Sequence, residues 1–133
     1  MANAMFDQGR QDFLAGAADW DADNFKCHLL DAADHTTNLA TNRDLADITA
    51  AGIEEVSANL ASKTTTDGTA DAADITFTAA SGDSCEEIHC YRDSGVAATS
   101  SMIFRWDTAT GLPVTLNGGD VDIQWNASGL ATL

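Results

Sequence analysis

The chain has few basic residues, a single proline and no long apolar run, and two of these shortages exclude classes of function. Only 6 of its 133 residues are Lys or Arg, against 21 Asp and Glu, so the formal net charge is −15. A surface with this charge repels a phosphate backbone, and we expect no nucleic-acid partner. No apolar segment approaches the roughly 20 residues that cross a bilayer, so we expect no membrane association.

The start of the chain and its cysteines bear on where the protein resides. No basic segment followed by an apolar one is present, so we predict no signal peptide and a protein that stays in the cytoplasm. Three cysteines, Cys27, Cys85 and Cys90, are an odd number and favour reduced thiols over disulfides. Cys85 and Cys90 have only His89 nearby, which is too few ligands for zinc. We therefore expect no metal site and no cofactor.

Familiar catalytic motifs are also missing from the sequence. It contains no nucleophile elbow, no His-Glu-x-x-His and no phosphate-binding glycine loop. His89 and Cys90 are neighbours, but strand alternation puts their side chains on opposite faces. We predict no catalytic residue and a protein that is not an enzyme.

What the sequence does contain is a series of short alternating apolar sets separated by Asp, Thr, Ser and Gly. Four of these sets are centred on Phe77, Ile88, Phe104 and Ile123. Their spacing of roughly 10–15 residues is typical of an antiparallel β-sandwich or barrel. We predict one mainly β domain over residues 1–133, with the β part at 24–133.

The alternation also makes local predictions. A strand is expected over residues 24–31, with Cys27 facing the core. Met102, Phe104 and Trp106 are expected on one strand face. Gly118-Gly119 predicts a hairpin turn between Leu116 and Val121. Residues 32–53 read as a long polar loop with a helical turn at 43–48, a length that favours a functional or mobile segment.

An amphipathic helix is predicted near the start, over residues 3–15 of an N-terminal segment 1–16. Asn3 is the expected N-cap and Gly16 the expected stop. Its predicted apolar face carries Met5, Phe6, Gly9, Phe13 and Leu14. So short a helix must pack on something, either its own sheet or a partner.

The residues we predict to bind a partner are Met5, Phe6, Phe13 and Trp20. Trp20 lies between two aspartates in a turn and is expected to be exposed. The alternative, that the apolar stripe covers the domain's own core, stays open. Trp106 and Trp125 fit core or interface anchors, with a carbohydrate-binding platform as the other interpretation.

Aspartates at alternate positions, Asp19, Asp21 and Asp23, are similar to the start of a calcium loop. Such a loop needs Gly at its sixth position and Glu at its twelfth, where this chain has Asn24 and Leu30. We interpret the segment as an acidic turn, and a weak cation site built with other loops stays an alternative.

Three stretches carry a resemblance to a known class of proteins. They are the N-terminal thirty residues, with Met1–Phe6, Phe13–Gly16 and Asp19–Asp21; residues 66–77; and residues 107–125, with Asp107–Val114 and Asn117–Asp120. In these the chain resembles small structural proteins of tailed-phage virions. The resemblance implies a non-enzymatic virion protein and brings no catalytic residue with it.

Within that class we favour a capsid decoration (cement) protein, which binds the major capsid protein at many copies and clamps the shell. By analogy with such proteins we expect a trimer-like homo-oligomer on the virion, assembled in the host cytoplasm. The alternatives are a tail or head-tail adaptor component and, less favoured, a carbohydrate-binding module.

Overall fold

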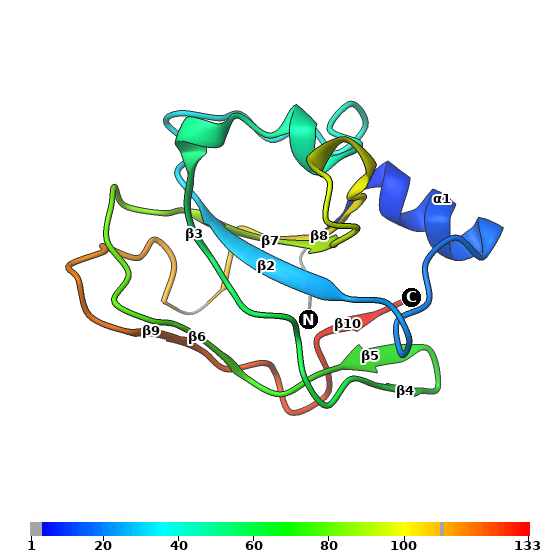
Figure 1. Ribbon diagram of the computed structural model, residues 1–133. Helices are drawn as coiled ribbons and strands as arrows, with labels where there is room; N and C mark the ends of the chain where they lie inside the picture. Colours follow the sequence, from blue (N-terminus) through cyan, green and yellow to red (C-terminus); the bar gives the residue numbers. More distant parts are fainter. Residues whose placement is uncertain (1–3, 110) are drawn as a thin grey trace.

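The computed structural model describes residues 4–109 and 111–133, and it is mainly β with one short α-helix near the start (Figure 1). Its strands are β1 (Ala4–Met5), β2 (Phe25–Leu30), β3 (Ile53–Val56), β4 (Thr64–Thr66), β5 (Thr69–Asp71), β6 (Ile75–Phe77), β7 (Glu87–Arg92), β8 (Met102–Trp106), β9 (Val121–Ile123) and β10 (Ala131–Thr132). Its helical elements are α1 (Asp7–Ala15) and the 3-10 turns η1 (Leu45–Asp47), η2 (Ala50–Gly52) and η3 (Ala97–Thr99).

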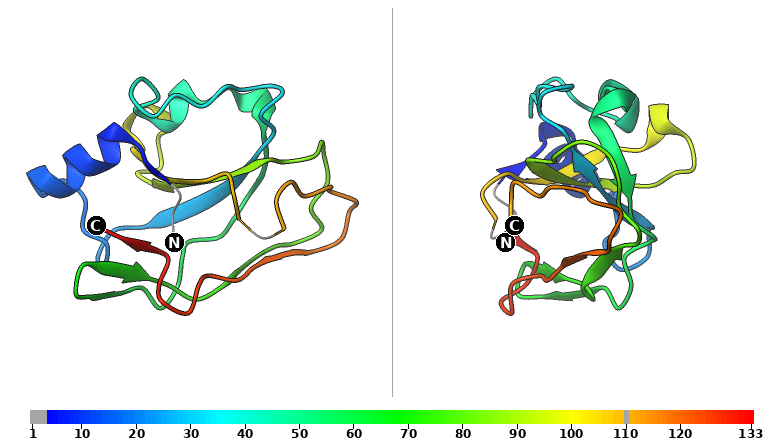
Figure 2. Two further views of the ribbon diagram at one scale, coloured as in Figure 1. Left: turned by 180° about the vertical axis from the view of Figure 1, so that it is seen from behind. Right: turned by 90° about the vertical axis from the view of Figure 1, so that its left-hand side faces the viewer.

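The strands form one large and two small antiparallel sheets. The large sheet has the order β1-β8-β7-β2-β3, and the small ones have the orders β10-β5-β4 and β6-β9. The small sheets lie against one face of the large sheet in a sandwich-like arrangement (Figure 1, Figure 2). The predicted mainly β antiparallel fold with a short N-terminal helix is thus confirmed.

The inner face of the large sheet, which meets the small sheets, is apolar. Phe25 and Cys27 of β2 point to it, as do Ile88 and Cys90 of β7, and all four are buried. Phe77 of β6 comes from the opposite side. Because both layers present alternate apolar residues, the main core forms between them, and Cys27 lies there as predicted.

The outer face is covered by residues 32–52 rather than by strands. Beneath this segment lies a second apolar cluster that includes Leu30, Tyr91 and Met102. The segment adds Ile48, with Leu39 and Leu45 packed beside it. The predicted loop with a helical turn is confirmed at η1, and Figure 1 shows it running above the sheet.

Strand β8 corrects one prediction. Cys90 pairs with Phe104 but Tyr91 pairs with Met102, so Ile103 is an extra residue in β8. This bulge turns Met102 to the outer cluster while Phe104 and Trp106 stay in the inner one. The expectation that Met102 shares their face is wrong, because a bulge shifts the alternation by one residue.

The N-terminal helix begins later than predicted. Ala4 and Met5 pair with Arg105 and Phe104 as edge strand β1, and α1 starts at Asp7. The predicted N-cap Asn3 lies outside the described residues. Met5 and Phe6 are compatible with a strand as well as with a helix face. Ala4 and Met5 form a strand because the edge of β8 offers them backbone partners.

Helix α1 packs closely on β8 and ends where predicted. Gly9 faces the backbone of Ile103, where an added Cβ would stand 2.8 Å from the Ile103 Cα. Gly16 adopts a left-handed φ of 72° and stops the helix, as predicted. Leu14, placed on the apolar face by the sequence, is 88% exposed and corrects that prediction.

The predicted hairpin at Gly118-Gly119 is also wrong. Strand β9 pairs with β6. The two glycines bond to Ala80 beyond the end of β6, with Gly118 N–H donating at 2.7 Å and Gly119 C=O accepting at 2.9 Å. The glycine turn therefore leads β9 toward β6, whose residues pair with it from 44 to 48 positions earlier in the chain, and β9 does not fold back on its neighbour.

Candidate functional site

Trp20, predicted to be exposed, is buried. Its exposed fraction is 4%, its ring centroid lies 4.6 Å from that of Phe25, and its indole N–H donates to the Asp71 carbonyl at 3.1 Å. The prediction is wrong because the turn carries the indole back over the sheet. There its one polar atom finds a partner, so burial leaves nothing unsatisfied.

The other three predicted contact residues also pack on the chain itself. Phe6 is 0% exposed and meets His89 edge-on, with ring centroids 5.3 Å apart. Phe13 stacks against Phe104 at 6.4 Å, and Met5 packs on the inner core. The stripe therefore covers the domain's own β core, the alternative that the sequence left open. Only Met5 and Phe13 of the four remain partly accessible.

Helix α1 and the C-terminus lie toward the same end of the molecule (Figure 1, Figure 2), and each carries an exposed leucine. Leu14 of α1 is 88% exposed and Leu133 is 60% exposed. Leu133 lines a groove of about 440 Å³, which does not include Leu14; the other lining residues are Phe13, Gly16, Ala18, Asp19, Trp20, Asp21, Thr65, Gly68, Thr69 and Ala70. We call Leu14, Leu133 and this groove the α1-end surface. It combines an apolar floor with an acidic wall.

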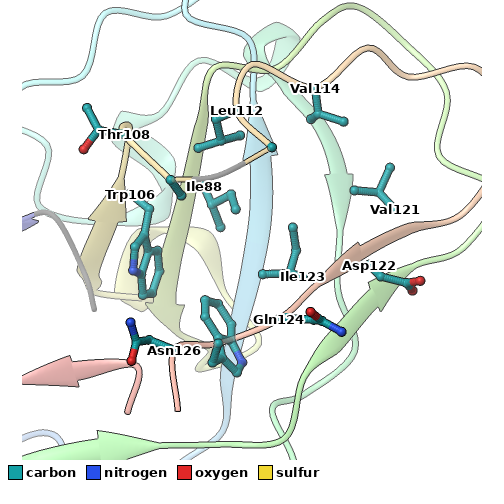
Figure 3. Close-up of a pocket in the computed structure, with 13 residues that line it drawn as sticks. Ile88, Trp106, Thr108, Leu112, Val114, Val121, Asp122, Ile123, Gln124 and Asn126 are labelled. Carbon is teal, nitrogen blue, oxygen red and sulfur yellow. The ribbon is translucent and has the colours of Figure 1, made fainter. Parts of the chain in front are cut away.

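A larger cavity, of about 590 Å³, opens between the large sheet and β9 (Figure 3). Trp106 and Trp125 line it with their ring centroids 5.0 Å apart, and Ile88, Leu112 and Ile123 add apolar wall. We call it the tryptophan cavity. Its shape and aromatic walls suit an uncharged ring or an apolar side chain.

Polar groups around the tryptophan cavity already serve the fold. The Trp125 indole N–H donates to the Ala73 carbonyl at 3.1 Å, and Asp122 accepts from the Thr76 hydroxyl at 2.6 Å. The Asn126 carboxamide oxygen accepts the Ser128 N–H at 2.8 Å. A ligand would therefore meet the aromatic and apolar walls together with polar groups such as Gln124.

The most concentrated polar chemistry is sealed under residues 32–52. His28 Nε2 lies 2.9 Å from His89 Nδ1, and His89 Nε2 lies 3.2 Å from Glu87 Oε1. The Thr37 hydroxyl donates to the same Glu87 oxygen at 2.9 Å, and Arg105 approaches it to 3.9 Å. Both histidines are 0% exposed. We call these five residues the histidine network.

Burial sets the protonation states in this network. It lowers the pKa of both His28 and His89, in His28 with the neighbouring His89 as a further cause. Burial alone would raise the pKa of Glu87, but hydrogen bonds from His89 and Thr37 outweigh it and lower that pKa. At neutral pH the network thus holds neutral imidazoles beside a carboxylate. The two imidazoles are shielded from solvent, whereas Thr37 and Arg105 at the margin of the network are partly exposed.

Carboxylates gather in two places. Asp19 Oδ1 accepts the N–H groups of Asp21 and Ala22, and Asp23 Oδ2 accepts that of Asp19, which makes the predicted acidic turn. A second group, missed by the sequence reading, brings one oxygen each from Asp31, Asp34, Glu54 and Asp83 within 4.8 Å of one another. These four could hold a cation. They come from separate segments, so spacing in the sequence gives no sign of them.

The three cysteines are free and buried, in keeping with the predicted reduced thiols. Burial raises the pKa of Cys85 to about 12 and places that of Cys90 above its usual value. Such thiols form little thiolate and make poor nucleophiles or metal ligands.

No family model matches the chain, and no curated protein matches it significantly. In the described ranges, no helix has both the length and the apolarity that crossing a membrane requires.

Proposed function

We propose that this protein is a non-enzymatic virion structural protein of a tailed phage, and that it decorates the capsid by binding the major capsid protein. The resemblance at residues 1–30, 66–77 and 107–125 suggests the class. The observation that carries the binding role is the α1-end surface, where the exposed Leu133 lines a groove and the neighbouring helix α1 exposes Leu14. Exposed apolar surface of this kind is typical of a contact site.

The charge distribution favours a particular kind of partner surface. The chain carries −15, and Asp19 and Asp21 stand on the groove wall. A capsid surface with apolar side chains among Lys or Arg would complement it. Like charges also keep free copies apart, most strongly at low salt, so a trimer-like cluster would form on the shell rather than in solution.

The copy number in purified particles tests the placement. Quantitative mass spectrometry should find hundreds of copies for a shell protein. Around six to a dozen copies would favour the alternative of a tail or head-tail adaptor component. Absence from particles would overturn both roles.

Leu14→Glu tests the surface itself. We expect it to abolish binding of the purified protein to empty capsids, because it places a charge in a desolvated contact. Val96→Glu is the matched control, since Val96 is also exposed, at 59%, but lies at the start of the η3 turn. Equal binding by both variants would remove the α1-end surface from the proposal.

A carbohydrate-binding role is the second candidate, favoured by the Trp106–Trp125 pair in the tryptophan cavity. It predicts that neutral saccharides change the tryptophan fluorescence of the wild type and not that of Trp125→Ala. Saccharide binding without capsid binding would favour this role over decoration.

A further inference from the structure

The hydrogen bonds of the histidine network run in one direction. Glu87, ionised at neutral pH, can only accept, so the His89 Nε2 at 3.2 Å must carry the proton. The His89 Nδ1 is then an acceptor and takes the Nε2–H of His28 at 2.9 Å. The chain of donors is His28 to His89 to Glu87, with both imidazoles neutral.

This arrangement has no place for another proton. A proton on His89 Nδ1 would point at the Nε2–H of His28. A proton on His28 Nδ1 would create a buried N–H with nothing to donate to, because that atom has no hydrogen-bond partner among the described residues. A charge on His89 would lie beside Glu87, but His28 would then have to accept at Nε2 and carry its own proton on the unpartnered Nδ1. A charge on His28 would have no carboxylate beside it in the network, and either arrangement leaves a buried polar group unsatisfied, which is costly.

Residues 32–52, which cover this network, are held to the rest of the molecule by hydrogen bonds between individual groups and not by a strand ladder. The ends of the segment meet at the Asp31 N–H and Gly52 carbonyl, 2.8 Å apart. Its backbone bonds to other elements include Leu45 to Ser100 at 2.8 Å and Met102 to the Arg43 carbonyl at 2.9 Å. Between its ends it is built of turns, with η1 and η2 as its helical elements.

The histidine network itself helps to hold residues 32–52 in place. Thr37 reaches down from the segment to Glu87 at 2.9 Å and to His89 at 3.2 Å. Further along the segment, His35 accepts the Thr49 N–H at 3.1 Å. Other titratable or charged groups lie on every surrounding element. They are Lys26 of β2, Glu54 and Glu55 of β3, Tyr91 and Arg92 of β7, Arg105 of β8, Asp7, Arg10 and Asp12 of α1, and Asp34, Arg43, Asp44 and Asp47 of the segment.

We propose that residues 32–52 cover the outer face of the sheet at neutral pH and open in acid. Protonation of the His28–His89 pair drives the opening. When the segment lifts, water reaches both rings and each can take a proton. Opening also uncovers Phe6, Tyr91 and Met102 of the outer apolar cluster. The inner core lies on the other face of the sheet, so it stays folded.

The sign and size of the effect follow from proton linkage. The closed state excludes protons that the open state binds below an ordinary histidine pKa of about 6.5, so acid favours opening. Between pH 7.5 and 5.5 each excluded proton increases the opening equilibrium about tenfold, and two increase it about a hundredfold. Carboxylates ordinarily titrate near pH 4, below this window.

Hydrogen exchange followed by mass spectrometry on the full chain tests the proposal, with times corrected for the intrinsic effect of pH. Amides of residues 32–52 should lose about a hundredfold of protection from pH 7.5 to 5.5, while those of β2, β7 and β8 keep theirs. His28→Gln/His89→Gln should remove this response. His35→Gln replaces the protein's third histidine, which lies in the segment itself and outside the His28–His89 pair, and this control should retain the response.

Three results would overturn the proposal. They are unchanged protection of the wild type at pH 5.5, equal loss throughout all sheets, and a response that persists in the double variant. If the double variant does not fold, His28→Gln alone decides, because one remaining trigger should leave about a tenfold response. A full hundredfold response in that single variant would reject the pair as trigger.

Discussion

The two faces of the five-stranded sheet are covered in different ways, and the polar residues follow that difference. The inner face meets two further sheets and carries apolar side chains such as Cys27 and Phe104. The outer face meets a turn-rich segment and carries His28, His89 and Glu87 among its apolar residues. Strands satisfy their own backbone groups in ladders, whereas an irregular cover also relies on side-chain hydrogen bonds to hold it in place.

The largest effect should come from the inner face. Phe104 is 0% exposed, and its ring faces those of Phe13, Trp20 and Trp106. Phe104→Ala should lower the free energy of unfolding by about 3–5 kcal/mol, because it removes apolar contacts and leaves a cavity. Urea denaturation at pH 7 measures this. A loss below about 1 kcal/mol would contradict the assignment of this face as the main core.

A smaller loss is expected where α1 meets the sheet. Gly9→Ala would bring a Cβ within 2.8 Å of the Ile103 Cα, and backbone must move to admit it. We expect a destabilisation of about 1–3 kcal/mol in thermal or urea unfolding. Helix propensity alone would make the change stabilising by about 1 kcal/mol, so the sign decides whether the helix packs this closely.

Loss of one hydrogen bond on the outer face should lower the free energy of unfolding by less. Thr37→Val deletes the hydroxyl that donates to Glu87, and we expect a cost of about 1–2 kcal/mol because the carboxylate keeps only part of its bonding. Thr36→Val is the matched control on an exposed neighbour and should change stability by less than about 0.5 kcal/mol. Equal effects would show that Thr37 does not fasten the segment.

The smallest effect on folding is expected at the exposed end of α1. Leu14→Glu should change the free energy of unfolding by less than about 0.5 kcal/mol, because its side chain is 88% exposed. A normal urea midpoint would make its loss of capsid binding a contact effect. A large destabilisation would mean that Leu14 packs on the fold after all.

Period-two alternation predicted the strands where one face is buried and the other is not. Strand β6 shows this best, since Ile75 and Phe77 are buried and Thr76 between them is exposed. The same rule failed at Met102, because a bulge in β8 leaves no mark in the local pattern. It also missed β1, whose two residues become a strand only because β8 has a free edge.

The histidine network was harder to predict, because it depends on the pairing register between β2 and β7. His28 and His89 are 61 positions apart and meet only because β2 and β7 pair them directly. Both lie in strands whose two faces are buried, so alternation does not distinguish a buried histidine from an exposed one. Trp20 was misplaced for a related reason: its acidic neighbours suggested exposure, while the distant Asp71 carbonyl receives its N–H.

The protonation of the two buried histidines tests the contrast between the faces most directly. In a ¹⁵N-histidine NMR titration from pH 8 to 5.5, the folded protein should show His28 and His89 as neutral imidazoles protonated at Nε2. Neither should titrate until residues 32–52 lose their protection. If either ring titrates near pH 6.5 while that segment stays closed, the outer face is not sealed, and the account is wrong.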